Sequence, residues 1–206
     1  EVYIGLHGWS GSHKTFLPLL EYLPARARLL APDLPGHGCS PVPQRWSLGE
    51  VTREIAELIT SLETPPVTIV GSCTGGILGL FAAQRLGDRV QRIVLIDPFA
   101  YVPWYFNLFV APRLGRIGRY AYLTTFANPV GRWLTNASLR RHRVRQTNLT
   151  TSFSAVNHEV IYTYLKLFSE AGQAEQFRGV TAQVEIVYGE RTFAAVKESA
   201  RRWRAV

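Results

Sequence analysis

The sequence Gly71-Ser72-Cys73-Thr74-Gly75-Gly76 joins an apolar run, residues 67–70, to a helix-like run, residues 77–86. An apolar run of this length that ends in turn residues is typical of a buried strand. A strand, a turn flanked by glycines and a helix form the setting of a nucleophile elbow, whose usual pattern is Gly-x-Ser-x-Gly. Here Cys73 occupies the central position, so the motif predicts a thiol at the tip of the turn.

The spacing of the glycines has a steric reason. Gly71 and Gly75 lie two residues before and two residues after Cys73, where the strand and the helix must approach each other closely. The helix that begins near Thr74 adds a positive N-terminal dipole, which we expect to favour the thiolate form of Cys73. The alternative interpretation is that Cys73 is a small buried residue in a tight turn, because free cysteines are commonly buried.

Strand-like and helix-like segments alternate along much of the chain. Further strands are predicted at 2–6, 27–31, 92–96 and 184–188, and further helices at 15–22, 48–62 and from about residue 194. Because the strands are almost continuously apolar, we expect an α/β fold with a mostly parallel, doubly wound sheet that is covered on both faces. Ligands of such sheets bind beyond the carboxyl ends of the strands. The polar residues near these ends are His7, Asp33, Cys73, Asp97 and Glu190.

Residues 99–178 interrupt this alternation. They are rich in aromatic residues and arginine and contain no clear strand, so we predict a helical cap inserted between a first core part, 1–98, and a second core part, 179–206. The segment carries nine Arg and one Lys against three Glu, which is most of the net charge of +8. Such a cluster can attract an anionic substrate, an acidic partner or an anionic membrane surface, or it can be a solvated helix face.

Composition limits the class of protein. The 206 residues are enough for one domain with a sizeable core, and 47% hydrophobic against 18% charged residues is typical of a globular chain. Two cysteines make no disulfide framework, and no signal-like segment or membrane-length apolar run occurs, so we expect a cytoplasmic protein without a transmembrane segment. The sequence has no metal-ligand spacing, phosphate-binding loop or nucleic-acid motif, so we predict no cofactor, no metal and no nucleic-acid partner.

Four segments together resemble the α/β-hydrolase superfamily. They are residues 6–12, 33–40, 71–76 and 186–191, and their order and spacing agree over nearly the whole chain. The resemblance implies that Cys73 is the catalytic nucleophile and that the backbone N–H groups of Trp9 and Thr74 form the oxyanion hole. A cysteine in the elbow is similar to dienelactone hydrolases and polyhydroxyalkanoate synthases, whose elbows read Gly-x-Cys-x-Gly.

The chain departs from the family pattern at two points. Thr192 follows Gly189-Glu190-Arg191 at the position where the family commonly carries Asp, so Asp97 at the end of the neighbouring strand becomes the candidate acid. The alternative is that Asp97 is a turn residue before Pro98. The family's catalytic histidine lies after its last strand, and no histidine follows His158. The first two strands and the last strand of the family also have no counterpart in this sequence. We therefore expect either that the natural chain continues at both ends or that this is a reduced form that cannot run a triad.

The histidines of the chain are weaker candidates for the base. His142 and His158 lie in the predicted cap, and we expect His7 and His37 to be structural loop residues. The sequence therefore predicts hydrolysis or transfer of an ester or thioester through an acyl-Cys73 intermediate, on a small acyl substrate that carries a carboxylate or a phosphate. The alternative function is that of a non-catalytic member of the fold, which binds a small hydrophobic or anionic ligand under the cap.

Overall fold

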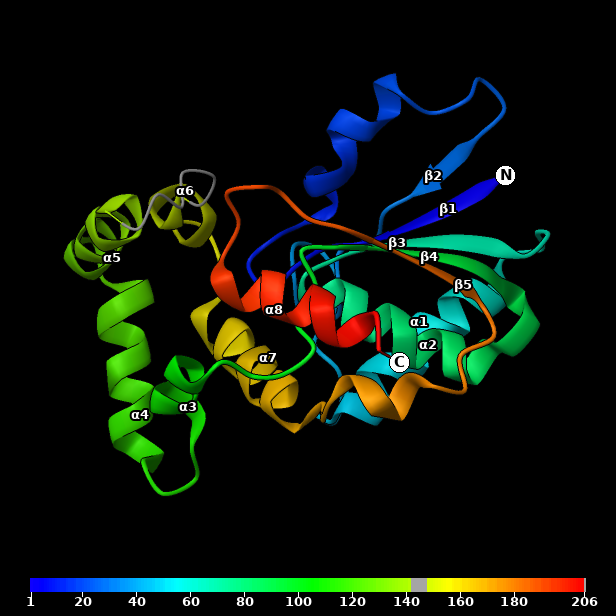
Figure 1. The fold of residues 1–206 in the computed structure, drawn as a ribbon. Coiled ribbons are helices and arrows are strands. Elements are labelled where there is room, and N and C mark those ends of the chain that lie inside the picture. Colours follow the sequence, from blue (N-terminus) through cyan, green and yellow to red (C-terminus); the bar gives the residue numbers. More distant parts are fainter. Residues whose placement is uncertain (142–147, 206) are drawn as a thin grey trace.

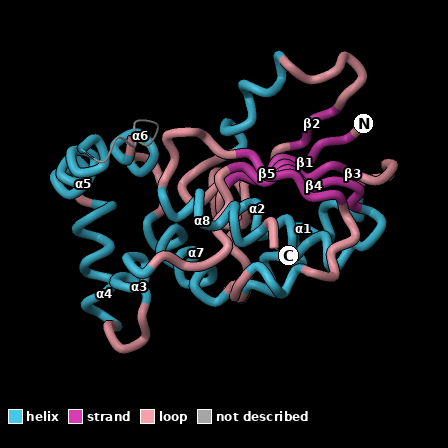
Figure 2. The backbone as a smooth tube through the Cα atoms, viewed as in Figure 1, coloured by secondary structure: helices cyan, strands magenta, loops and turns pink. Residues whose placement is uncertain are grey.

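A five-stranded parallel sheet in the order β2-β1-β3-β4-β5 forms the centre of the computed structural model, which describes residues 1–141 and 148–205 (Figures 1 and 2). The strands are β1 (Val2–Leu6), β2 (Arg28–Leu30), β3 (Val67–Ser72), β4 (Val90–Ile96) and β5 (Gln183–Val187). Each strand lies within two residues of a predicted one, which confirms the α/β fold.

Three α-helices cover one face of the sheet: α1 (Leu48–Ser61), α2 (Thr74–Leu86) and α8 (Ala194–Trp203) (Figure 1). Helix α1 begins after Ser47, whose hydroxyl accepts a hydrogen bond from the backbone N–H of Glu50 at 3.1 Å. Its apolar stripe is buried in the core that lies between the sheet and these helices. A short 3₁₀ turn, η2 (Gly87–Arg89), links α2 to β4.

The opposite face of the sheet differs from the prediction. It carries a 3₁₀ helix, η1 (His13–Glu21), instead of the expected α-helix, and the ring of Phe16 packs on β1 at Gly5, where a Cβ atom would lie 2.7 Å from it. Towards β4 and β5 the described residues leave this face open. Arg92 and Glu185 form an exposed ion pair there at 3.5 Å. The sheet is therefore covered on one face and only partly on the other.

Residues 99–178 contain helices and loops in their described part. The helices are α3 (Trp104–Val110), α4 (Gly115–Tyr122), the π-helical turn η3 (Leu123–Ala127), α5 (Pro129–Arg141), α6 (Leu149–Phe153), α7 (His158–Glu170) and the 3₁₀ turn η4 (Ala174–Phe177). Helices α3 to α6 lie to one side of the sheet (Figure 1). We call residues 99–178 the inserted segment after the prediction above, and their role as a cap stays a prediction. No helix in 1–141 or 148–205 is long and apolar enough to cross a bilayer.

Helix α7 belongs to two clusters of buried side chains. Val160, Tyr164 and Leu167 join the core beneath the sheet. Ile161 and Leu165 belong to a second cluster, which is mainly aromatic and consists of residues of the inserted segment. The members of this aromatic cluster are Val110, Tyr122, Phe126, Leu149, Phe153, Ile161, Tyr162 and Leu165. The inserted segment therefore has a core of its own, and α7 joins it to the sheet.

Candidate active site

Cys73 lies at a strained turn between β3 and α2. Its φ of 52° and ψ of −115° are unusual for a residue with a side chain. The backbone N–H of Cys73 donates to the carbonyl of Ile96 in β4 at 2.8 Å, and its carbonyl accepts from the N–H of Gly76 at 3.1 Å. Backbone strain of this kind persists only where the surroundings fix it, and it is common at functional sites.

The two predicted glycines of the turn are sterically required. A Cβ atom on Gly71 would lie 2.3 Å from the Cα of Gly76, at the start of α2. A Cβ atom on Gly75 would lie 2.1 Å from the carbonyl oxygen of Leu6 and 2.4 Å from that of His7. Gly75 therefore allows the first turn of α2 to press against the end of β1, which places the loop after β1 next to Cys73.

Two backbone N–H groups face the sulfur of Cys73. They belong to Thr74, the first residue of α2, and to Trp9, in the loop after β1, and each hydrogen bond lowers the pKa of the thiol. The ring Nε2–H of His37 donates to the carbonyl of Trp9 at 3.2 Å, which holds the other side of that loop. The structure thus brings Cys73, Thr74 and Trp9 together, and their roles as nucleophile and oxyanion hole stay a prediction.

The resting thiol differs from the expected thiolate. Burial, and to a smaller extent the negative charge of Asp97, raises the pKa of Cys73 to about 11, against the two N–H groups that lower it. Desolvation therefore outweighs the N-terminal field of α2. Burial is also the main reason why the pKa of the neighbouring Tyr105 is raised to about 12, with smaller contributions from the charges of Tyr101 and Cys73. Tyr105 was one of many aromatic residues in the sequence, and no local pattern distinguished it.

Asp97 ends β4 next to Cys73. Its φ of 48° makes it, with Cys73, one of two non-glycine residues with positive φ in the described part of the chain. Its backbone N–H donates to the carbonyl of Val187 at 2.9 Å, and its Oδ1 accepts from the N–H of Gly189 at 3.4 Å. Asp97 thus joins the ends of β4 and β5, and its carboxylate charge acts on Cys73.

The side chain of Trp9 enters the inserted segment. Its indole N–H donates to the carbonyl of Ile161 in α7 at 2.7 Å. Its ring contacts four aromatic rings at centroid distances of 5.2 to 6.2 Å. These rings belong to Phe106, Tyr122, Phe126 and Phe153. The backbone of Trp9 therefore faces Cys73, and its side chain packs in the aromatic cluster. No sequence pattern indicated this double contact.

Within the described residues, no histidine hydrogen-bonds to Cys73 or Asp97. His7 is buried, donates from Nδ1 to the carbonyl of Gly8 at 2.9 Å and accepts at Nε2 from the N–H of Leu34 at 2.9 Å. Its role is structural, as predicted, and the bond from His37 to Trp9 is of the same kind.

The other described candidates make no hydrogen bond to Cys73. The carboxylate of Asp33 is hydrogen-bonded to the ring of His13, with 3.0 Å between Nδ1 and Oδ1. His158 is 3.2 Å from the hydroxyl of Tyr122 in the aromatic cluster. Glu190 is exposed in the loop after β5. His142 lies outside the described residues.

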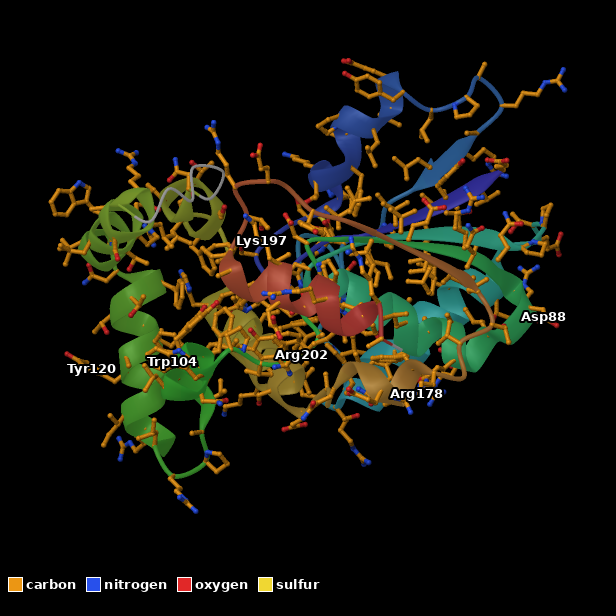
Figure 3. All side chains as sticks on the ribbon, viewed as in Figure 1. Asp88, Trp104, Tyr120, Arg178, Lys197 and Arg202 are labelled. Atoms are coloured by element: carbon orange, nitrogen blue, oxygen red, sulfur yellow. The ribbon has the colours of Figure 1, made fainter. Side chains whose placement is uncertain are left out.

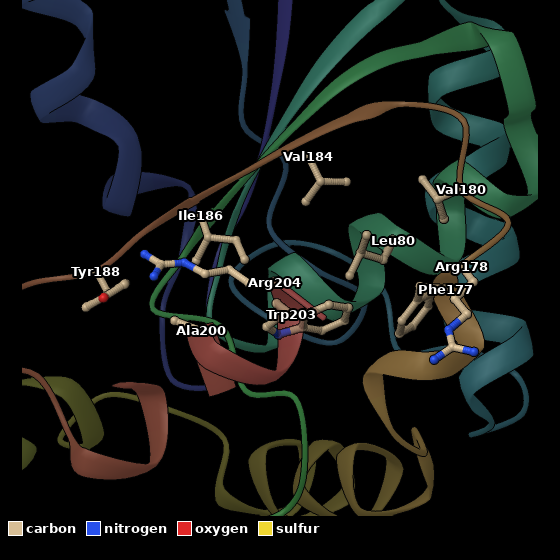
Figure 4. Close-up of a pocket in the computed structure, with 10 residues that line it drawn as sticks. All are labelled: Leu80, Phe177, Arg178, Val180, Val184, Ile186, Tyr188, Ala200, Trp203 and Arg204. Carbon is tan, nitrogen blue, oxygen red and sulfur yellow. The ribbon is translucent and has the colours of Figure 1, made fainter. Parts of the chain in front are cut away.

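A groove of about 350 Å³ opens elsewhere, between α2, η4, β5 and α8 (Figure 4). Its apolar lining includes Leu80, Val184, Ile186 and Trp203. The lining contains neither Cys73 nor the residues that face it, so this groove is separate from the candidate active site. In 1–141 and 148–205 no group of three His, Cys, Asp or Glu side chains is placed to hold a metal ion.

A comparison with known protein families finds a match over residues 4–202. The chain belongs to the alpha/beta hydrolase family. A pimeloyl-[acyl-carrier protein] methyl ester esterase of Neisseria meningitidis is 31% identical over 137 residues, 65% of this chain and 42% of the relative. Lipase LipV of Mycobacterium tuberculosis is 32% identical over 93 residues, 45% of this chain and 35% of the relative. The chain thus spans less than half the length of these curated relatives.

Solved structures of the family share the fold. The enol-lactonase of Burkholderia xenovorans has a TM-score of 0.71 at 17% identity, over 98% of this chain and 77% of its own. MenH of S. aureus has a TM-score of 0.72 at 15% identity, over 98% of this chain and 80% of its own. At these identities the likeness concerns the fold alone.

Proposed function

We propose that this family member hydrolyses an ester or thioester through an acyl-Cys73 intermediate. The observation that carries the proposal is the convergence on one sulfur of a strained turn and of two backbone N–H groups, those of Thr74 and Trp9. The relatives named as an esterase and a lipase support the ester as the substrate class. The arginine excess of the inserted segment supports an acyl substrate that carries a carboxylate or a phosphate.

In the proposed acylation, the thiolate of Cys73 attacks the carbonyl carbon of the substrate, forming a C–S bond. The N–H groups of Thr74 and Trp9 stabilise the oxyanion of the tetrahedral intermediate, for which one such donor contributes roughly 3 to 4 kcal/mol. The bond to the alcohol or thiol then breaks, and the leaving group takes up the proton that the base removed from Cys73. Water hydrolyses the thioester and regenerates the thiol; another acceptor in place of water gives acyl transfer.

The raised pKa of Cys73 makes a general base necessary. With a pKa of about 11, roughly one thiol in ten thousand is ionised at neutral pH. The proposal assigns the base to a histidine outside the described residues and the orientation of that histidine to Asp97. The position of Asp97 beside Cys73 supports this role.

The test is intact-mass spectrometry after exposure to p-nitrophenyl acetate. Because Cys39 is an exposed thiol, the experiment uses Cys39→Ser and compares it with Cys39→Ser/Cys73→Ala. We expect an acetyl group on Cys73, located by peptide mapping, in the first protein, and in the second only the acetylation of lysine and N-terminal amines that both proteins share. Because only the thiolate attacks, the rate of acylation in this chain should rise about tenfold per pH unit below a pKa of about 11. Equal acetylation of the two proteins would exclude the proposed nucleophile.

A second candidate function is the binding of a small hydrophobic or anionic ligand without turnover. The observation in its favour is the partly buried, neutral thiol, which has no histidine partner within the described residues. The same experiment separates the two functions. Absence of an acetyl adduct up to pH values near the pKa of Cys73, in a protein with native circular dichroism, would favour the binding function.

A further inference from the structure

The α3–α4 hairpin of the inserted segment exposes four large apolar side chains on its outer face. Trp104 is 73% exposed, Leu108 51%, Ile117 72% and Tyr120 70%. Trp104 and Tyr120 lie on the side of the molecule away from the sheet (Figure 3). Single exposed apolar residues are ordinary on protein surfaces, but a group of them on adjoining helices marks an interaction surface.

The two helices of the hairpin touch backbone to backbone. A Cβ atom on Gly118 of α4 would lie 2.4 Å from the carbonyl oxygen of Phe109 and 3.4 Å from that of Leu108 in α3. This close approach makes the outer side chains of the two helices neighbours. The inner side of α4 is already occupied, because Tyr122 is fully buried in the aromatic cluster. The outer apolar side chains therefore contribute nothing to the core of the segment.

Arginine accompanies these apolar side chains. Arg113 and Arg116 are exposed in the connection and in the first turn of α4, and α3, α4 and α5 contain no acidic residue. Helix α5 repeats the combination, with Val130, Trp133 and Leu134 exposed by 56% to 65% and Arg140 exposed near its end. The surface is therefore apolar and predominantly basic, with Glu159 of α7, the ion-pair partner of Arg119, as its acidic neighbour. Such a surface complements an anionic partner rather than a neutral one.

We propose that the outer face of the α3–α4 hairpin binds the surface of an anionic lipid bilayer. Trp and Tyr favour the interface between headgroups and acyl chains, where their rings are apolar and their polar atoms stay hydrated. An amphipathic helix with arginine beside aromatic and aliphatic residues lies in the plane of that interface. A protein partner would bury such anchors in pockets of its own, whereas a bilayer accepts side chains that project from a helical hairpin. The proposal concerns binding alone and does not depend on the chemistry of Cys73.

The test is sedimentation with lipid vesicles at low and high salt. Vesicles of phosphatidylcholine alone are compared with vesicles of phosphatidylcholine and phosphatidylglycerol. We expect the protein to bind the anionic vesicles in preference and to lose binding as salt is added, because surface charges are screened over about 10 Å at 0.1 M. Arg113→Gln/Arg116→Gln should weaken binding to anionic vesicles by about fivefold per arginine, the factor that corresponds to about 1 kcal/mol.

Apolar variants and matched controls complete the design. Trp104→Ser/Tyr120→Ser should weaken binding by about tenfold per aromatic side chain, since burial of such a side chain contributes at least about 1.4 kcal/mol. Tyr22→Ser and Arg26→Gln change an exposed tyrosine and an exposed arginine on the opposite side of the chain's fold, near η1, and should leave binding unchanged. Circular dichroism verifies that each variant is folded.

Three outcomes would overturn the proposal. The first is equal binding of the wild-type protein and both double variants to anionic vesicles. The second is a homodimer in analytical ultracentrifugation that dissociates in Trp104→Ser/Tyr120→Ser while no protein sediments with vesicles, which would assign the face to a second copy of the chain. The third is retention on immobilised polyglutamate without vesicle binding, which would assign it to an acidic protein.

Discussion

The turn at Cys73 and the inserted segment are stabilised by different kinds of contact, one between backbone atoms and the other between side chains. Around Cys73 the contacts are between backbone atoms, and Gly75 lies so close to β1 that a single methyl group has no room. In the inserted segment the contacts are between aromatic rings, most of them edge to face or tilted. A turn in which backbone atoms are in contact has no room for an added atom. A cluster of side chains instead distributes its stabilising energy over many weak contacts, so one substitution removes only part of it.

The largest effect is expected for Gly75→Ala. The added Cβ would meet the carbonyl oxygens of Leu6 and His7 at 2.1 and 2.4 Å, and β1 is paired on both sides, with β2 and β3, so it cannot shift without disturbing the sheet. We expect a loss of roughly 4 kcal/mol or more in the free energy of unfolding, or failure to fold. Urea denaturation followed by circular dichroism measures it.

Gly49→Ala is the matched control. Gly49 lies in the first turn of α1, and a Cβ atom there meets nothing within 4 Å. Alanine should stabilise the protein by about 0.5 to 1 kcal/mol, because glycine is a poor helix former. If the free energy of unfolding of Gly75→Ala were within 1 kcal/mol of that of the wild-type protein, the backbone description of the elbow would be wrong.

The second prediction concerns pH. Burial is the main cause that lowers the pKa of His7 to about 4, and the charges of His37 and His13 act in the same direction. The hydrogen bond to Gly8 and the charge of Asp33 oppose this shift. The unfolded chain therefore binds more protons than the folded one between about pH 6.5 and 4. Stability should be complete above pH 6.5 and should fall by roughly 3 kcal/mol as the pH is lowered to about 4.

His7→Gln tests the assignment, because the glutamine amide oxygen can accept the N–H of Leu34 but does not titrate. The decrease in stability between pH 6.5 and 4 should become shallower in this variant. The remaining slope reports His37 and His158, whose pKa values burial also lowers. A variant with the slope of the wild-type protein would show that other groups cause the acid sensitivity.

The same contrast explains what the sequence could predict. The elbow was visible because its geometry needs glycine at fixed spacing, and the strands were visible because a parallel sheet needs apolar runs. Both requirements act on neighbouring residues, so they leave a local pattern. The proximity of Trp9 and Thr74 followed from the family resemblance, and the structure brings their N–H groups to the sulfur.

Other features depend on residues that are distant in the sequence. The pKa of Cys73 was expected to be low because the local motif shows the helix and not the burial that outweighs it. The positive φ of Asp97 depends on β5, which comes ninety residues later in the chain. The contact of Trp9 with α7 spans 152 residues, and no spacing rule describes it.

The last prediction concerns Trp9, which belongs to both regions. Trp9→Phe removes the indole N–H that donates to Ile161 and leaves part of the space among the four aromatic rings empty. We expect a loss of about 2 kcal/mol in the free energy of unfolding, from the hydrogen bond and the lost packing together. Trp104→Phe, at a tryptophan that is 73% exposed, should change it by about 0.5 kcal/mol or less.

Alkylation of Cys73 then decides whether the two regions are coupled. The backbone N–H of Trp9 lowers the pKa of Cys73, so a loop that shifts when its side chain is shortened should raise that pKa and slow alkylation by iodoacetamide. The measurement uses the Cys39→Ser background, in which Cys73 is the only cysteine of the 206-residue sequence. If stability falls but the alkylation rate does not change, the loop is positioned by its core contacts, such as the bond from His37 to the carbonyl of Trp9, and the aromatic cluster has no influence on the sulfur.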